Sequence, residues 1–139
     1  MLALKYKSIL IPTDGSASSE EVIELVCSMQ KVLEASIHVI YVVEIPRNLP
    51  LGTIIPDKVE SARAALSGAQ QTADRLGVVI NTSTIYARTS EDTILSTSEE
   101  LKCDVIAIAQ DNRKLRIFSN MALNINQRAK CSVWIFNNK

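Results

Sequence analysis

The stretch from Lys7 to Glu21, KSILIPTDGSASSEE, decides the fold of this chain. An apolar run from Ile9 to Ile11 leads directly into Pro12-Thr13-Asp14-Gly15-Ser16, and serines and acids then open a helical pattern. This order predicts a short buried strand, a tight turn and the start of a helix. Such a turn lies at the carboxyl end of a sheet strand, where open α/β folds place their ligands. Asp14 is therefore the first candidate site residue.

Strand and helix patterns alternate along the rest of the chain. Strands are expected at 8–12, 37–43, 78–86, 105–109 and 133–136, and helical patterns cover 22–33, 59–76, 90–101 and 120–130. Ser18 with Glu21 predicts a capping box, Ser90 an N-cap and Gly77 a helix end. The stretch 45–56 is expected to be a loop. The alternation predicts an α/β fold with a five-stranded parallel sheet and helices on both faces, in a single domain over residues 1–139.

Composition excludes several classes of function. The net charge is +0, so nothing favours binding to nucleic acid or to an anionic membrane. No apolar run approaches the roughly 20 residues of a spanning helix, so no membrane insertion is expected. The stretch MLALKYK does not resemble a secretory signal, and a cytoplasmic location is expected by default.

Cysteine and histidine usage gives no pattern typical of a metal site. Cys27, Cys103 and Cys131 are far apart in sequence and are expected to be buried apolar side chains, with a redox or metal role as the alternative. His38 is the single histidine and lies in an apolar run, so it is expected to be a strand residue. A histidine-based metal site and a Ser-His-Asp triad are both disfavoured.

Common ligand motifs of doubly wound folds are absent. A dinucleotide site requires G-x-G-x-x-G after the first strand, where this chain has only Gly15, and the Walker A pattern is missing. A receiver domain requires an aspartate after the third strand, where this chain has Tyr86-Ala87-Arg88. The signatures of class I synthetases and of ATP pyrophosphatases are also missing.

One family does match. From about Tyr6 to Phe136 the chain resembles the universal stress proteins, in the segments ILIPTDGS at 9–16, HVIYVV at 38–43, CDVIAI at 103–108 and AKCSVWIF at 129–136. The resemblance implies the adenine nucleotide alpha hydrolase-like form of the α/β fold. It also implies a regulatory module of the stress response.

The family's ATP-binding loop is not matched. The resemblance places that loop, G-x-x-G-x9-G-[ST], after the fourth strand, with its first glycine at Ala109 and its last near Ser119. No glycine follows Gly77 in this sequence. Glycines let consecutive amides point at phosphate, whereas a side chain disfavours positive φ and adds a Cβ near the ligand. We therefore expect no cofactor, no enzymatic activity and no ATP binding of the usual kind.

Two alternatives remain open. The first is an adenine-nucleotide-binding protein that takes ATP with Mg and hydrolyses it weakly. Its candidate site comprises Pro12, Thr13, Asp14, Val42, Val43, Ala109, Arg113, Lys114, Arg116 and Ser119, in which the basic side chains would hold the phosphates. Against it, Asp14 could simply cap its own turn, and the basic loop could be solvated. The second alternative is the soluble regulatory domain of a membrane transporter.

A partner surface is expected at the last strand. Trp134 and Phe136 alternate with Val133 and Ile135, so an edge strand would present apolar side chains on both faces. In the family this strand commonly forms the dimer contact. We therefore predict a homodimer through Val133, Trp134, Ile135, Phe136 and Asn137, with docking on another protein as a further possibility. The alternative is an edge strand covered by the chain's own helices.

Overall fold

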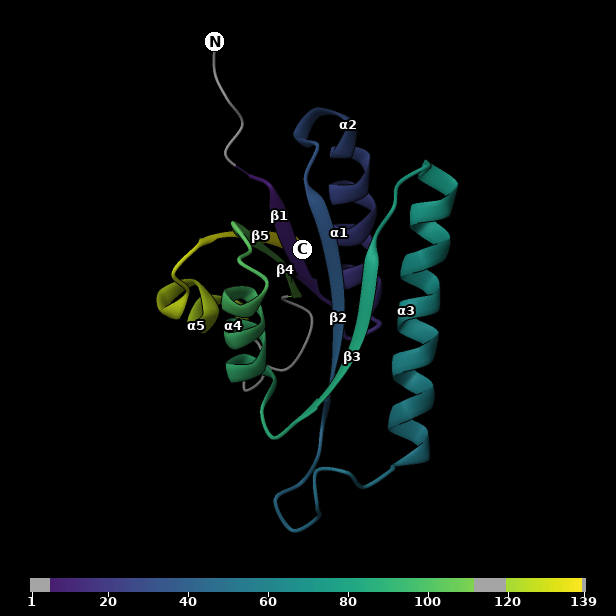
Figure 1. Cartoon of the computed structure of the whole chain (residues 1–139), viewed down its shortest axis with the longest axis vertical. Helices are drawn as coiled ribbons and strands as arrows, with labels where there is room; N and C mark the ends of the chain where they lie inside the picture. Colours follow the sequence, from purple (N-terminus) through teal and green to yellow (C-terminus); the bar gives the residue numbers. More distant parts are fainter. Residues whose placement is uncertain (1–5, 112–119, 139) are drawn as a thin grey trace.

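The computed structural model describes residues 6–111 and 120–138, and its elements follow the predicted alternation (Figure 1). In chain order they are β1 (Ser8–Pro12), α1 (Ala17–Ser28), α2 (Gln30–Leu33), β2 (Ser36–Glu44), α3 (Pro56–Leu76), β3 (Asn81–Ala87), α4 (Ser90–Glu100), β4 (Val105–Asp111), α5 (Met121–Arg128) and β5 (Ser132–Asn138). None of the helices in these two ranges is both long enough and apolar enough to cross a membrane.

The five strands form one parallel sheet in the order β3-β2-β1-β4-β5. Ile9 of β1 pairs with Ile37 of β2 on one side and with Val105 of β4 on the other. The chain therefore moves outward from β1 in one direction through β3 and then returns to add β4 and β5 on the opposite side. This reversal confirms the predicted fold class and creates a ligand crevice at the carboxyl ends of β1 and β4.

Helices cover both faces of the sheet. In Figure 1, α1 and α3 lie on one side and α4 and α5 on the other. Ile9 and Ile11 pack with the first pair of helices, whereas Leu10 packs with the second pair, because successive side chains of a strand point to opposite faces. The central strand β1 is therefore buried on both faces, and its carboxyl end lies at the crevice.

Several element ends differ from the predictions. The strand predicted at 78–86 begins only at Asn81, since Val78 closes α3 by donating its N–H to Ala73 O at 2.8 Å. The helix predicted over 22–33 is divided at Met29 into α1 and α2. Gly77 does end α3, with φ of 71°.

Two predicted caps are wrong. The N-cap of α1 is Ser16, whose side chain accepts the Ser19 N–H, and Ser18 is a buried residue inside the helix. The Ser18–Glu21 capping box therefore does not exist. Ser90 is the first residue of α4 rather than its N-cap, and Thr89 occupies the cap position without a side-chain cap hydrogen bond.

Candidate functional site

A pocket lies at the carboxyl ends of β1, β2 and β4, where the strand order reverses. Its walls come from the β1 turn, the end of β2, the start of α4, the end of β4 and the start of α5. The lining residues are Pro12, Thr13, Asp14, Ser19, Tyr41, Val42, Ser90, Ile94, Ile108, Ala109 and Met121. Most of this wall is apolar, and the polar groups gather around Asp14 and Ser90. The composition suits a small ligand with one flat apolar part and a few polar atoms.

The β1 turn holds Asp14 through its own hydrogen bonds. Asp14 Oδ1 accepts the Ser16 N–H at 2.9 Å and the Ser19 hydroxyl at 2.9 Å. Thr13 Oγ1 accepts the Gly15 N–H at 3.1 Å, and Gly15 has a φ of 81°. The carboxylate therefore shapes the turn that leads into α1, as an aspartate does in an Asx turn.

Gly15 is required at this turn for two reasons. Its positive φ is unfavourable for residues with a side chain. A Cβ placed on it would also lie 3.3 Å from the Ala65 Cβ of α3. The turn is therefore packed against a helical residue, Ala65, that comes 50 positions later in the chain.

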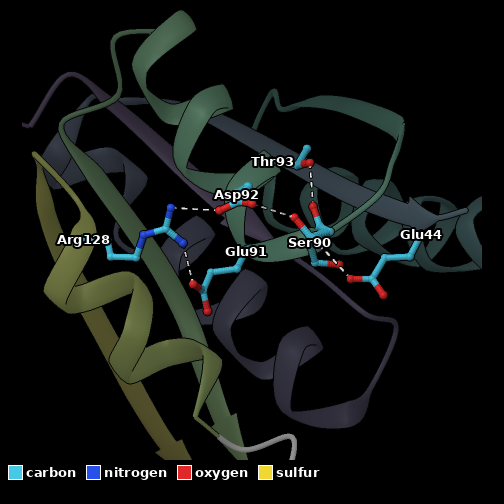
Figure 2. Close-up of polar contacts among 7 residues, drawn as sticks. Glu44, Ser90, Glu91, Asp92, Thr93 and Arg128 are labelled. Atoms are coloured by element: carbon cyan, nitrogen blue, oxygen red, sulfur yellow. Dashed lines mark hydrogen bonds and ion pairs between the residues drawn. The ribbon is translucent and has the colours of Figure 1, made fainter. Parts of the chain in front are cut away.

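The opposite wall of the pocket is the amino end of α4. Glu44 Oε2, at the end of β2, accepts the Ser90 N–H at 2.7 Å (Figure 2). The Thr93 hydroxyl donates to Thr89 O at 2.7 Å, and the Thr89 hydroxyl donates to Asp92 Oδ2 at 3.1 Å. The Glu44 carboxylate of strand β2 therefore satisfies a free backbone amide at the positive end of helix α4.

Arg128 joins α5 to the same end of α4. Its Nη1 lies 2.6 Å from Glu91 Oε2, and its Nη2 lies 2.8 Å from Asp92 Oδ1, so one guanidinium spans both acids (Figure 2). Hydrogen bonds from Arg128 and from Thr89 lower the pKa of the Asp92 carboxyl below its usual range. This bridge fixes α5, whose first residue, Met121, closes one side of the pocket.

The structure brings together five of the predicted site residues: Pro12, Thr13, Asp14, Val42 and Ala109. Val43 does not join them. Its side chain is 2% exposed and packs with Ile45 and Ala62 on the α3 side of the sheet. Of these two neighbouring valines, Val42 packs with the cluster on the α4–α5 side and lines the pocket, whereas Val43 does not line it. Arg113, Lys114, Arg116 and Ser119 lie outside the described residues.

Sequence reasoning missed several of the lining residues. Tyr41 and Ile108 are the sequence neighbours of the predicted residues Val42 and Ala109, and this adjacency at the strand ends was the available signal. Ile94 and Met121 come from helices, and no local pattern indicates that they meet the β1 turn. Among residues 6–111 and 120–138, no three His, Cys, Asp or Glu side chains cluster closely enough to hold a metal ion.

The last strand is at the edge of the sheet, as predicted. β5 pairs with β4 alone, from Val105↔Ser132 onward. Trp134 and Phe136 pack partly against the cluster beneath α1 and α3, and Val133 and Ile135 against the cluster beneath α4 and α5. The Tyr6 ring meets Trp134 edge to face, with centroids 5.3 Å apart.

Comparison with known proteins gives a consistent result. The model of the universal stress protein family matches residues 5–137. A universal stress protein of Methanocaldococcus jannaschii is 26% identical in an alignment 139 positions long, which spans 94% of this chain and 81% of that protein.

Solved structures of the same family share the fold. A universal stress protein in complex with cAMP is similar with a TM-score of 0.79 and 18% identity, over 96% of this chain and 99% of that one. A universal stress protein from Archaeoglobus fulgidus in complex with dAMP has a TM-score of 0.73 and 15% identity, over 96% and 98% of the two chains.

Proposed function

Since this chain belongs to the universal stress protein family, we propose that it is a non-enzymatic regulatory module that does not hold ATP through a glycine-rich loop. It acts by pairing with a second copy through β5 or by docking on a protein partner. The observation that carries this proposal is the path of β4 beside the pocket.

β4 continues as a regular paired strand where the family's phosphate loop would begin. Ala109 pairs with Phe136, and Gln110 pairs with Asn137. Successive N–H groups of an extended strand point in opposite directions, whereas a phosphate cradle requires consecutive N–H groups that converge on one anion. This backbone supports a pocket that lacks the usual triphosphate cradle at Ala109.

The edge position of β5 supports the second half of the proposal. One side of this strand is occupied by β4, and the described residues place no further strand beyond it. Its four alternating apolar side chains are only half-buried. A second chain that pairs there would cover both apolar faces and satisfy the edge backbone groups.

A second candidate function is the binding of an adenosine-containing ligand in the pocket. It is favoured by the position of the pocket at the strand reversal, with Asp14 and Val42 on its wall. Relatives of the same fold hold cAMP and dAMP, which carry a single phosphate. A monophosphate needs fewer amides than a triphosphate, and Arg113, Lys114 and Arg116 could supply side-chain donors.

Thermal unfolding with Mg-ATP, ADP, AMP and cAMP separates the two candidates. A ligand present at 100 times its dissociation constant stabilises the folded state by about 2.7 kcal/mol, which raises the melting temperature by several degrees. We expect no shift with Mg-ATP. A shift with AMP or cAMP alone would favour the second candidate, and a shift with Mg-ATP would contradict the first.

Variants decide whether any shift comes from this pocket. Asp14→Ala removes the carboxylate but also loosens the turn, because Asp14 accepts the Ser16 N–H and the Ser19 hydroxyl. Val42→Phe is therefore the cleaner change, since it fills the pocket without removing a hydrogen-bonding group. Its matched control is Val79→Phe at a valine that is 87% exposed and away from the pocket. If the ligand binds in this pocket, the shift of the melting temperature must vanish in Val42→Phe and persist in Val79→Phe.

A further inference from the structure

Cys103 and Cys131 are 28 positions apart in sequence, but they precede two neighbouring strands and belong to one apolar cluster. Cys131 immediately precedes β5, and Cys103 stands two residues before the first residue of β4, the parallel neighbour of β5. The Ser132 N–H, next to Cys131, donates to the carbonyl of Asp104, next to Cys103, at 3.1 Å. The backbones that carry the two cysteines are therefore joined by the ladder itself.

Both cysteines lie in the apolar cluster beneath α4 and α5. The Cys103 N–H donates to Ser98 O at 2.8 Å, in the last turns of α4. Cys103 is fully inside this cluster and Cys131 packs against it, and Cys103 is near enough to Cys131 to contribute to the raised pKa of the Cys131 thiol. Cys27 belongs to the cluster on the opposite face of the sheet.

We propose that Cys103 and Cys131 form a redox pair, which closes to an intramolecular disulfide when the protein meets a peroxide. Cys131 is half-buried and reacts first, whereas Cys103 is only 8% exposed and acts as the resolving thiol. This inference does not rest on the function proposed above.

The chemistry balances with hydrogen peroxide as the oxidant. The Cys131 thiolate attacks one peroxide oxygen, the O–O bond breaks, and hydroxide leaves with a proton as water, so that the sulfur becomes a sulfenic acid. The Cys103 thiolate then attacks the Cys131 sulfur, the S–O bond breaks, and a second water leaves. Two thiols and one peroxide become one disulfide and two waters.

The surroundings of the two thiols set the rate of their oxidation. Burial raises the pKa of both the Cys131 and the Cys103 thiols. Because the thiolate is the nucleophile, oxidation at neutral pH is slow and accelerates as the pH rises.

Closure would change a specific part of the molecule. The disulfide ties the start of β5 to the start of β4 and encloses α5 in a covalent loop. Met121 on the pocket wall and the edge strand both lie on elements anchored by that loop. Oxidation would thus restrain the candidate pocket and the candidate partner edge together.

The test treats the full chain with hydrogen peroxide, then unfolds it, alkylates free thiols and maps the peptides by mass spectrometry. The reduced protein has three thiols to alkylate. After oxidation we expect a mass loss of two hydrogens, a single alkylated cysteine at Cys27 and a cross-linked peptide pair that contains Cys103 and Cys131. The half-time of this loss should shorten as the pH rises.

Single variants assign the order of events. Cys103→Ser should leave a Cys131 sulfenic acid that a dimedone probe traps, Cys131→Ser should leave Cys103 reduced, and Cys27→Ser should close the disulfide like the wild type. Any of three results with the wild type would overturn the proposal. These are three free thiols after oxidation, a disulfide between two chains, and oxidation of Cys131 without a cross-link. The peptide map of the wild-type protein decides the question by itself. The proposal therefore stays testable even if one of the variants fails to fold.

Discussion

The Glu44 carboxylate at the end of β2 accepts the backbone N–H of Ser90 at the start of α4, at 2.7 Å. The two residues are 46 positions apart, and no other side chain in the described part of the chain caps this helix end. Glu44 therefore links the strand that lines the pocket to the helix that faces it (Figure 2). The contact is both a cap and a tie between two pocket walls.

Removal of this contact should destabilise the fold. Glu44→Ala leaves the Ser90 N–H without its acceptor and removes a negative charge from the positive end of α4, so we expect a loss of about 1 kcal/mol in the free energy of unfolding. Glu44→Gln keeps an acceptor and should lose less. The matched control is Glu100→Gln at the other end of α4, where a carboxylate is unfavourable. Equal losses for Glu44→Ala and the control in urea denaturation would contradict the role given to Glu44.

The glycines of the chain should respond unequally to alanine. Gly15 and Gly77 both have positive φ, and an alanine in that conformation costs about 1–2 kcal/mol. Gly15→Ala should cost more than Gly77→Ala, because only at Gly15 would the new methyl group press against Ala65, whereas nothing lies within 4 Å at Gly77.

Gly68→Ala is the informative control for the same series. Gly68 lies inside α3, and the new methyl would meet only the flexible Glu20 carboxylate. Helix propensity then favours alanine by up to about 1 kcal/mol. Chemical denaturation of the three variants should rank them Gly68→Ala, Gly77→Ala and Gly15→Ala in falling stability, and any other order would refute the packing argument.

The Arg128 bridge should control the titration of Asp92. Because the pKa of this carboxyl is lowered in the folded state, its contribution to stability is present above the ordinary aspartate pKa and is lost as the pH falls through the lowered value. Arg128→Gln should bring the pKa of Asp92 back up toward its ordinary value, as followed by carboxyl carbon NMR. Lys130→Gln is the control, since Lys130 contacts Glu99 instead. A similar rise of the Asp92 pKa in both variants would show that Arg128 is not what lowers it.

The edge strand should mediate self-association if the partner surface is correct. Ile135→Lys places a charge on β5, and we expect sedimentation to show a monomer where the wild type is a dimer at tens of micromolar. Trp134 is the only tryptophan of the chain, so its emission should shift to longer wavelength on dissociation. Ile85→Lys on the other edge strand, β3, is the matched control, because Ile85 is also a half-buried member of the α4–α5 cluster. A monomeric wild type would reject the dimer.

Local sequence was sufficient for the parts of the fold that depend on neighbouring residues. The apolar run that enters Pro12 predicted β1 to the residue, because a strand buried on both faces must be continuously apolar. Gly77 predicted the end of α3, because the left-handed conformation there favours glycine. Element order then implied the parallel sheet, and the candidate site at Asp14 followed from the position of its turn.

Only the tertiary structure decided which distant groups meet. The sequence by itself determined the alternation of strands and helices and the turn at Asp14, since periodicity and turn chemistry act over a few residues. Sheet pairing and helix packing decided that Glu44 caps α4, that Val43 turns away from the pocket while Val42 faces it, and that Cys103 and Cys131 share one apolar cluster. These contacts depend on strand register and on the packing of layers, which join residues that no local pattern relates.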